Sequence, residues 1–306
     1  MKEQSFFLKR GSETDIYVNS WVPDKIRAAV LIIHGMAEHS ARYRDFSKFL
    51  AENNFAAYGY DLRGHGKTAG DPDKVGFISG KGEWDKLLND LHELKKHISL
   101  KHKNRPIFLF GHSMGSFLAR NYAYLTKSKL DGIILSGNIG PQGIMGYAGL
   151  LLAKIEELIK GPDAKSHLLH NLTFGNYARH FKERRTEFDW LSSKKEAVDR
   201  YIKDPYCGSI FSASFFCDLL KAVIEINKMV NIKNTPKNLP ILMLTGSMDP
   251  VGDMTKGVKE ILKLYKQAGI KDITYKEYKD ARHEILHEKI NYQVYNDILN
   301  WLNKHL

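Results

Sequence analysis

One pentapeptide, Gly-His-Ser-Met-Gly at positions 111–115, constrains the fold of this chain more than any other feature. It follows the apolar run 107–110, typical of a buried strand, and precedes the run 117–123, typical of a helix. A serine at such a turn has a strained backbone and an exposed hydroxyl, and glycines two positions away on each side let strand and helix approach closely. The pattern therefore predicts a nucleophile elbow at Ser113.

Strand-like and helix-like segments alternate on both sides of this pentapeptide. Apolar, β-rich runs occupy positions 28–33, 55–60, 107–110, 132–136, 239–244 and 273–278. Helical periodicity occurs at 43–53, 84–98, 255–268 and 294–302. Such alternation predicts an α/β protein with a mostly parallel sheet and helices on both faces.

The alternation stops between position 141 and about position 208. This stretch is helix-like, aromatic and charged, and it lacks a clear buried strand. Because the strand–helix pattern resumes afterwards, we expect one core interrupted by an insertion. The predicted division is 1–140 for the first part of the core, 141–208 for a helical cap and 209–306 for the second part.

A serine hydroxyl needs a base that takes its proton, and the base needs an orienting acid. In hydrolases with such an elbow the order along the chain is serine, acid, histidine, each after a strand. Asp249 follows the run 239–244, and His283 follows the run 273–278. We therefore expect a catalytic triad of Ser113, Asp249 and His283.

Two other residues compete for these roles. Asp253 is four residues beyond Asp249 and lies farther from the end of its strand. His287 falls in a segment that reads as the start of the last helix, where an exposed or capping side chain is expected.

The negatively charged intermediate of acyl transfer needs two hydrogen-bond donors. One is expected from the backbone N–H of Met114, directly after the serine, and the other from the loop after the run 28–33. In that loop the N–H of Met36 is preferred, because a glycine precedes it. We expect His34 to brace the loop rather than act as a base, and the segment 61–66 to form a tight turn rather than a phosphate site.

Composition excludes several other classes. The net charge is +11, but the densest basic interval, 95–105, follows a predicted helix and leads into a strand. Basic residues stabilise the C-terminus of a helix, so we expect no nucleic-acid partner. Cys207 and Cys217 are too few for a disulfide framework, and neither lies in a cluster of His or Cys residues in the sequence. We expect no cofactor and no metal, and, because residues 1–10 do not resemble a secretory signal, a cytoplasmic location.

Five segments together resemble the monoacylglycerol lipase and lysophospholipase branch of the serine α/β-hydrolases. They are residues 34–43, 61–66, 111–115, 246–249 and 282–284. The resemblance implies the α/β-hydrolase fold with an eight-stranded sheet, the triad and oxyanion donors named above, and a cap over an acyl-binding pocket. It also implies a small lipid-like ester as substrate, a monoacylglycerol or a lysophospholipid. The apolar residues of 144–159 would either touch a membrane surface transiently or pack on the core.

Two alternatives remain open at this stage. Related hydrolases include aminopeptidases, which need acidic cap residues to hold the substrate's ammonium group. Four are available in the predicted cap: Glu156, Glu157, Glu183 and Glu187. A lipid-binding protein on a non-catalytic hydrolase scaffold is the other alternative.

Overall fold

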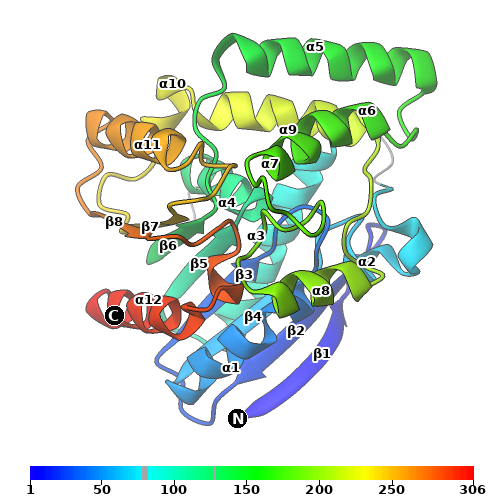
Figure 1. Cartoon of the computed structure of the whole chain (residues 1–306). Coiled ribbons are helices and arrows are strands. Elements are labelled where there is room, and N and C mark those ends of the chain that lie inside the picture. The colour runs from blue at the N-terminus through cyan, green and yellow to red at the C-terminus, as the bar shows by residue number, and fades with distance from the viewer. Residues whose placement is uncertain (78–81, 127–128) are drawn as a thin grey trace.

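In the computed structural model, which describes residues 1–77, 82–126 and 129–306, eight strands form one sheet (Figure 1). Their order across the sheet is β1-β2-β4-β3-β5-β6-β7-β8. The strands are β1 (Lys2–Leu8), β2 (Ile16–Val22), β3 (Ala28–Ile33), β4 (Phe55–Tyr60), β5 (Ile107–His112), β6 (Gly132–Ser136), β7 (Ile241–Gly246) and β8 (Ile273–Tyr278). Only the pairs β1–β2 and β2–β4 are antiparallel, so the prediction of a mostly parallel sheet is confirmed.

The two faces of the sheet bury alternate residues of the same strands, as the twofold repeat of a strand requires. On one face, Leu31 of β3 packs in a core formed with α3 (Glu83–Lys101), α4 (Met114–Leu125) and α11 (Lys256–Gln267). On the other face, Ile32 packs with α1 (Arg44–Glu52) and α12 (Asn291–Lys304). Both faces of β3 to β6 are therefore covered, which is why these strands read as continuous apolar runs.

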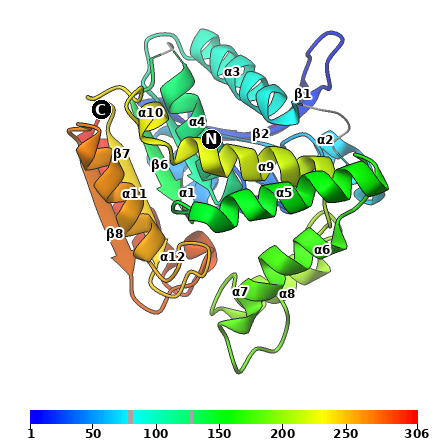
Figure 2. The same ribbon diagram turned by 90° about the horizontal axis from the view of Figure 1, so that it is seen from above.

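Helical segments fill the stretch that was predicted to be a cap. They are α5 (Gly143–Lys160), α6 (His167–His170), a π-helical turn (Asn171–Gly175), α7 (Asn176–Arg179) and α8 (Lys195–Lys203). Seen from above, α5 runs beside α9 (Ala213–Ile226), and α6 to α8 extend to one side (Figure 2). The division of the chain at 141 and 208 stays a prediction, because α9 packs on the cap helix α5 and on α4 of the core alike.

After this stretch the chain returns to the core through α9. The helix α9 ends at Ile226, where the side chain of Asn227 donates a hydrogen bond to the carbonyl of Val223, and α10 (Met229–Ile232) follows separately. The remaining short helix of the core is α2 (Gly66–Ala69), in the turn after β4. Within the described ranges, every helix is too short or too polar to cross a lipid bilayer.

Candidate active site

The turn after β5 holds Ser113 in a conformation that few side chains adopt. Its φ is 51° and its ψ is −123°, and α4 begins at the next residue. A Cβ atom on Gly111 would lie 2.4 Å from the carbonyl oxygen of Gly115, and one on Gly115 would lie 2.2 Å from that of Ile33. Both glycines are therefore required by close backbone approach, as the pentapeptide predicted.

His283 and Asp249 meet at the ends of β8 and β7. The Nδ1–H of His283 donates to Oδ1 of Asp249 at 2.9 Å, and both side chains are almost completely buried. Burial alone would lower the pKa of His283, but the charge and hydrogen bond of Asp249 outweigh it and raise that pKa above its ordinary value. Ser113 and His283 line one small cavity of about 30 Å³. The three residues predicted as a triad are thus assembled in one place.

The competing residues lie elsewhere. Asp253 is exposed at a left-handed φ of 49°, and the hydrogen bond to His283 comes from Asp249 instead. The expectation that His287 is exposed or caps a helix is wrong. Its Nε2 atom is buried, and its ring packs edge-on against Tyr43, because His287 ends a 3₁₀ turn (Ile285–His287) and α12 begins only at Asn291.

The loop after β3 passes directly over the serine. A Cβ on Gly35 would lie 3.1 Å from Cβ of Ser113, and Met36 and Met114 line the same cavity as Ser113. Met114 is the first residue of α4, so its N–H has no acceptor within the helix. His34 donates from Nδ1 to the carbonyl of Gly35 and accepts at Nε2 from the N–H of Leu62. These two hydrogen bonds fit the bracing role expected for His34, and burial, which lowers its pKa to about 4, favours the neutral ring that makes them.

The predicted tight turn at 61–66 is also confirmed. Asp61 accepts hydrogen bonds from the backbone N–H groups of Ser40 (2.8 Å) and Lys67 (2.7 Å). Gly66 has a φ of 45°, and a Cβ there would lie 2.3 Å from Oδ2 of Asp61. These internal contacts shape the turn, and its Leu62 N–H holds the ring of His34 at the start of the loop over the serine.

A buried charged network was missed in the sequence, where Glu38 had no assigned role. Glu38 accepts hydrogen bonds from the Gly35 N–H (2.6 Å) and the Tyr43 hydroxyl (2.8 Å) and pairs with Arg42 at 2.5 Å. The guanidinium of Arg42 also holds both carboxylate oxygens of Glu284, at 2.6 and 2.7 Å. Although burial opposes it, Arg42 lowers the pKa of both carboxyls. One cation thereby joins the loop over the serine to the loop that carries His283.

The segment predicted to be a cap contributes contacts with the His283 loop that the sequence did not indicate. The Trp190 ring lies 5.1 Å from the His283 ring, and the N–H of Glu284 donates to the carbonyl of Leu191 at 2.7 Å. Arg282 reaches back to the carbonyls of Asp189 and Ser192. No spacing rule links residues about 90 positions apart, so only the tertiary structure could reveal this contact.

A mostly apolar cavity of about 290 Å³ opens onto Ser113 and Met114. It lies between the core and the cap, since α4, α5, α9 and the segment 172–177 all contribute to it. Its aromatic side chains are Phe117, Phe174, Tyr177, Trp190 and Phe216. The site can therefore place an extended apolar group next to the serine hydroxyl.

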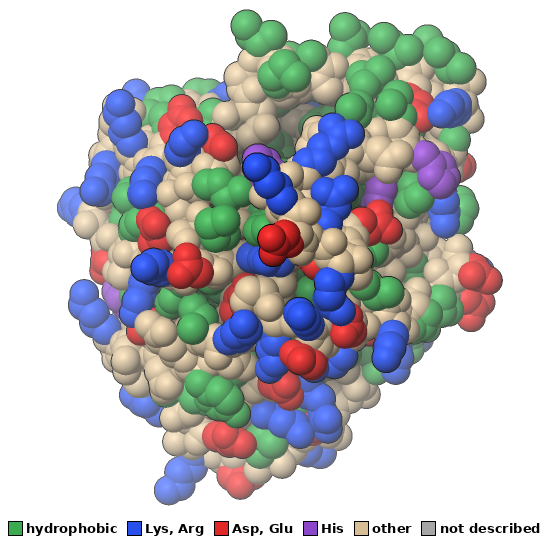
Figure 3. All heavy atoms as spheres, viewed as in Figure 1, with side chains coloured by type: hydrophobic (Ala, Val, Ile, Leu, Met, Phe, Trp, Pro, Cys, Tyr) green, Lys and Arg blue, Asp and Glu red, His purple; other side chains and the backbone are tan. Residues whose placement is uncertain are grey.

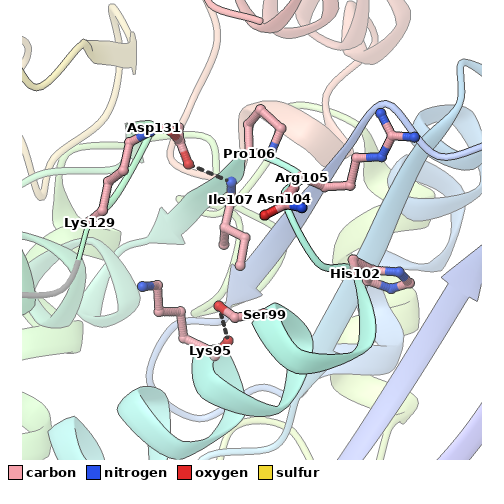
Figure 4. Close-up of a pocket in the computed structure, with 9 residues that line it drawn as sticks. All are labelled: Lys95, Ser99, His102, Asn104, Arg105, Pro106, Ile107, Lys129 and Asp131. Atoms are coloured by element: carbon pink, nitrogen blue, oxygen red, sulfur yellow. Dashed lines mark hydrogen bonds and ion pairs between the residues drawn. The ribbon is translucent and has the colours of Figure 1, made fainter.

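A larger cavity, of about 440 Å³, lies at the opposite end of β5 (Figure 4). There Asp131 accepts from the N–H of Ile107 at 2.8 Å and pairs with Lys129 at 3.1 Å. Ile107 begins the strand that Ser113 follows, which places this cavity about 20 Å from the serine. The basic interval lies at the end of α3 as predicted, remote from the reacting groups.

Although Cys207 lies in no His or Cys cluster along the sequence, two potential metal ligands lie beside it in the structure. Among the residues that the structure describes, one group of His, Cys and carboxylate side chains is close enough to share a metal ion: His39, Asp204 and Cys207. Cys217 lies outside this group, and both thiols are free.

A serine elbow after β5 and a buried histidine–aspartate pair after β8 and β7 define the class, an α/β-hydrolase. The chain belongs to the family described as serine aminopeptidase, S33, which matches residues 24–290. The resemblance seen in the sequence motifs is thereby confirmed.

Similar proteins indicate which kind of bond this chain hydrolyses. The chain is 26% identical to human monoglyceride lipase over 298 residues, which cover 94% of this chain and 87% of the human protein. It is 28% identical to the rat monoglyceride lipase over 295 residues, 94% of this chain and 85% of the rat protein. A crystal structure of a thermostable carboxyl esterase from Bacillus coagulans superposes with a TM-score of 0.92 at 27% identity, covering 99% of both chains. The chain is a carboxylic ester hydrolase.

Proposed function

We propose that this protein hydrolyses monoacylglycerols through an acyl-enzyme on Ser113. His283 takes the proton of the Ser113 hydroxyl as the oxygen attacks the ester carbonyl, and then passes it to the departing glycerol oxygen. Asp249 holds the Nδ1–H of His283, so that Nε2 is the basic nitrogen, and stabilises the imidazolium. Water then attacks the acyl-enzyme with the same histidine as base, releasing the fatty acid.

The backbone N–H groups of Met36 and Met114 are the proposed donors to the oxyanion. Support comes from the position of both residues around the cavity at Ser113 and from the orphan N–H at the start of α4. The hydrogen bond from the Gly35 N–H to Glu38 keeps the loop in place, so its donor is preorganised rather than recruited during reaction.

The apolar cavity at Ser113 carries the substrate assignment. Its volume of about 290 Å³ is at the lower end of ligand pockets, which suits a single acyl chain and not the three chains of a triacylglycerol. Within the described residues, its lining contains no Asp, Glu, Lys or Arg. A monoacylglycerol, whose head group is uncharged, matches such a lining better than a lysophospholipid does.

The aminopeptidase alternative gains little from the cap acids. None of Glu156, Glu157, Glu183 and Glu187 lines the described part of the cavity. Glu156 is instead bonded to Ser166 and Lys160, and Glu157 lies 3.5 Å from the Cys217 thiol. Within the part of the chain that the structure describes, an ammonium group in this cavity would therefore have none of these cap carboxylates beside it.

Replacement of the nucleophile tests the mechanism. We expect Ser113→Ala to reduce hydrolysis of a short p-nitrophenyl ester by about 10⁵–10⁶-fold and to abolish labelling by a fluorophosphonate. Ser12→Ala, at an exposed serine, is the matched control and should retain both. Hydrolysis or labelling by a folded Ser113→Ala protein at the wild-type level would refute the assignment.

A substrate panel tests the proposed specificity. We expect the highest kcat/KM for a monoacylglycerol, with lower values for the lysophospholipid and triacylglycerol of the same acyl chain and for aminoacyl-naphthylamides. A higher kcat/KM for the lysophospholipid or for the aminoacyl-naphthylamides would overturn the substrate assignment. It would not affect the assignment of the triad. Lack of reaction with every ester and with the fluorophosphonate would favour the non-catalytic lipid-binding scaffold.

Transient contact of the cap with a lipid surface is part of the proposal. Hydrophobic side chains gather over α5, above a hollow in the surface (Figure 3). The most exposed are Ile144, Met145, Leu151, Leu158 and Ile159, at 61–86% of their full exposure. Clusters of exposed apolar side chains are typical of interaction sites. A cytoplasmic location stays a prediction.

A further inference from the structure

Three potential metal ligands meet where the loop over the serine touches the cap. His39 belongs to that loop, whereas Asp204 directly follows α8 and Cys207 lies three residues later. The Nε2 atom of His39 is 2.9 Å from Oδ2 of Asp204, and the ligand atoms of all three residues lie within 4.8 Å of one another. The cluster thus joins segments 165 positions apart in the chain.

The spacing of these atoms is close to that of a zinc site. Zinc bonds of about 2.0–2.3 Å in a tetrahedron separate the ligand atoms by about 3.3–3.6 Å. One pair is already nearer than this, at 2.9 Å, and no pair is farther apart than 4.8 Å. Small side-chain adjustments therefore suffice to bring all three onto one ion.

The local backbone supports this arrangement. The N–H of Cys207 donates to the carbonyl of Asp204 at 3.0 Å, closing a turn that places both side chains on one side. Oδ1 of Asp204 accepts from the N–H of Tyr206, which leaves Oδ2 to face His39. A carboxylate oriented through its second oxygen is typical of metal sites.

Charge and access are also compatible with a divalent ion. A Zn²⁺ ion with one carboxylate, one thiolate and one neutral imidazole forms a complex with no net charge. The buried cation Arg42 lines the same groove as His39 and Asp204, and Glu38 and Glu284 already neutralise it. His39 and Asp204 line a groove of about 300 Å³, through which the ion and a fourth, water ligand can reach the cluster.

We propose that His39, Asp204 and Cys207 bind one Zn²⁺ ion that clips the loop over the serine to the end of α8. Softer divalent metals are favoured over Mg²⁺ or Ca²⁺, because the set includes sulfur and nitrogen. Binding requires Cys207 as a thiolate, so the thiol releases one proton to solvent. It also requires a neutral His39 with its proton on Nδ1, so that Nε2 is free to bind the metal. Because the triad lies outside the cluster, this site is separate from the proposed hydrolytic function.

Zinc titration of the whole, untagged chain after treatment with a chelator tests the proposal. Zn²⁺ alone is titrated in competition with a chromogenic chelator, and we expect one equivalent per wild-type chain. Cys207→Ser and His39→Gln should each weaken binding by at least about tenfold. Cys217→Ser, which removes the other thiol, is the matched control and should bind as the wild type does. Equal zinc affinity in the wild type and in Cys207→Ser would overturn the proposal.

Co²⁺ provides a measurement that does not depend on any variant folding. Bound to the wild type, it should produce a thiolate-to-metal charge-transfer band that added Zn²⁺ removes. Absence of this band from the wild type at saturating Co²⁺ would show that no thiolate is a ligand and would also overturn the proposal. Thermal unfolding without metal verifies that each variant is folded.

Discussion

The nucleophile turn and the cap helix α5 lie on opposite sides of one cavity and differ in what holds them. Around Ser113 the backbone itself is the constraint. Gly111 lies against the carbonyl oxygen of Gly115, and Gly115 lies against that of Ile33. On α5, the apolar side chains of Ile144 and Leu158 are 86% exposed and contact little of the protein. One region leaves no room for an added atom, whereas the other leaves large side chains uncovered.

This difference indicates that the two regions serve different steps, catalysis at the turn and contact with lipid at α5. Acyl transfer requires atoms positioned within tenths of an ångström, which a strained turn between a buried strand and helix supplies. Recognition of a lipid requires apolar area, which many side chains can provide without a fixed geometry. We therefore expect substitutions at the turn to affect chemistry and folding, and substitutions on α5 to affect access to lipid.

Among the substitutions that compare the two regions, the largest effect should come from the acid of the proposed triad. Asp249→Asn should lower kcat by about 10⁴-fold, because the amide no longer favours the productive tautomer of His283. Wild-type activity should fall as the pH drops through the raised pKa of His283, since only the neutral ring accepts a proton. In the variant, burial dominates, and this acidic limb should move to lower pH.

The pH dependence of kcat/KM measures both effects. Asp253→Asn, four residues away and exposed, is the matched control and should keep the wild-type rate and profile. If Asp253→Asn lost the rate and shifted the pH profile while Asp249→Asn did neither, Asp253 would be the acid of the triad.

A pair of glycine substitutions compares the two regions directly. Gly111→Ala places a methyl group 2.4 Å from a backbone carbonyl and should destabilise the fold by about 3 kcal/mol or more. Gly149→Ala, within α5, meets only Leu220 at 3.7 Å and should stabilise by about 0.5–1 kcal/mol. Urea unfolding measures both. Equal changes in the free energy of unfolding for the two variants would mean that backbone contact does not constrain the turn.

The smallest effect is expected on the cap surface. Ile144→Ser and Leu158→Ser should each weaken binding to phospholipid vesicles by about tenfold, because each removes exposed apolar area that lipid would cover. Hydrolysis of a soluble ester should be unchanged.

Leu100→Ser and Leu125→Ser are the controls for this comparison, since both leucines are more than half exposed but lie on α3 and α4. Cosedimentation with vesicles is the measurement. An equal loss in the control pair would show that any exposed leucine contributes and that α5 has no special role.

Much of the core could be predicted because its signals are local. The run 55–60 coincides with β4, and the run 273–278 coincides with β8, since apolar or β-branched residues between turns leave few alternatives. The meeting of Ser113, Asp249 and His283 followed from placing each at the carboxyl end of a parallel strand. Parallel strands bring those ends together regardless of the distance along the chain.

The contacts that the sequence did not indicate join segments for which no such rule exists. Glu38, Arg42 and Glu284 look like ordinary surface charges, and they form a buried network only because two loops cross. Trp190 reaches His283 from the cap, and Cys207 reaches His39 in the same way. The position of an inserted segment relative to the sheet is not set by strand pairing, so the sequence does not show which of its side chains reach the site.

The sequence by itself determined the α/β class, the strained serine turn and the order of the three reacting groups. These depend on glycine spacing and strand polarity, which the chain carries locally. Only the tertiary structure decided the size of the cavity over Ser113, the exposure of α5 and the cluster at Cys207. Those features depend on how the cap segments lie against the core, and that packing is set by many weak contacts distant in sequence.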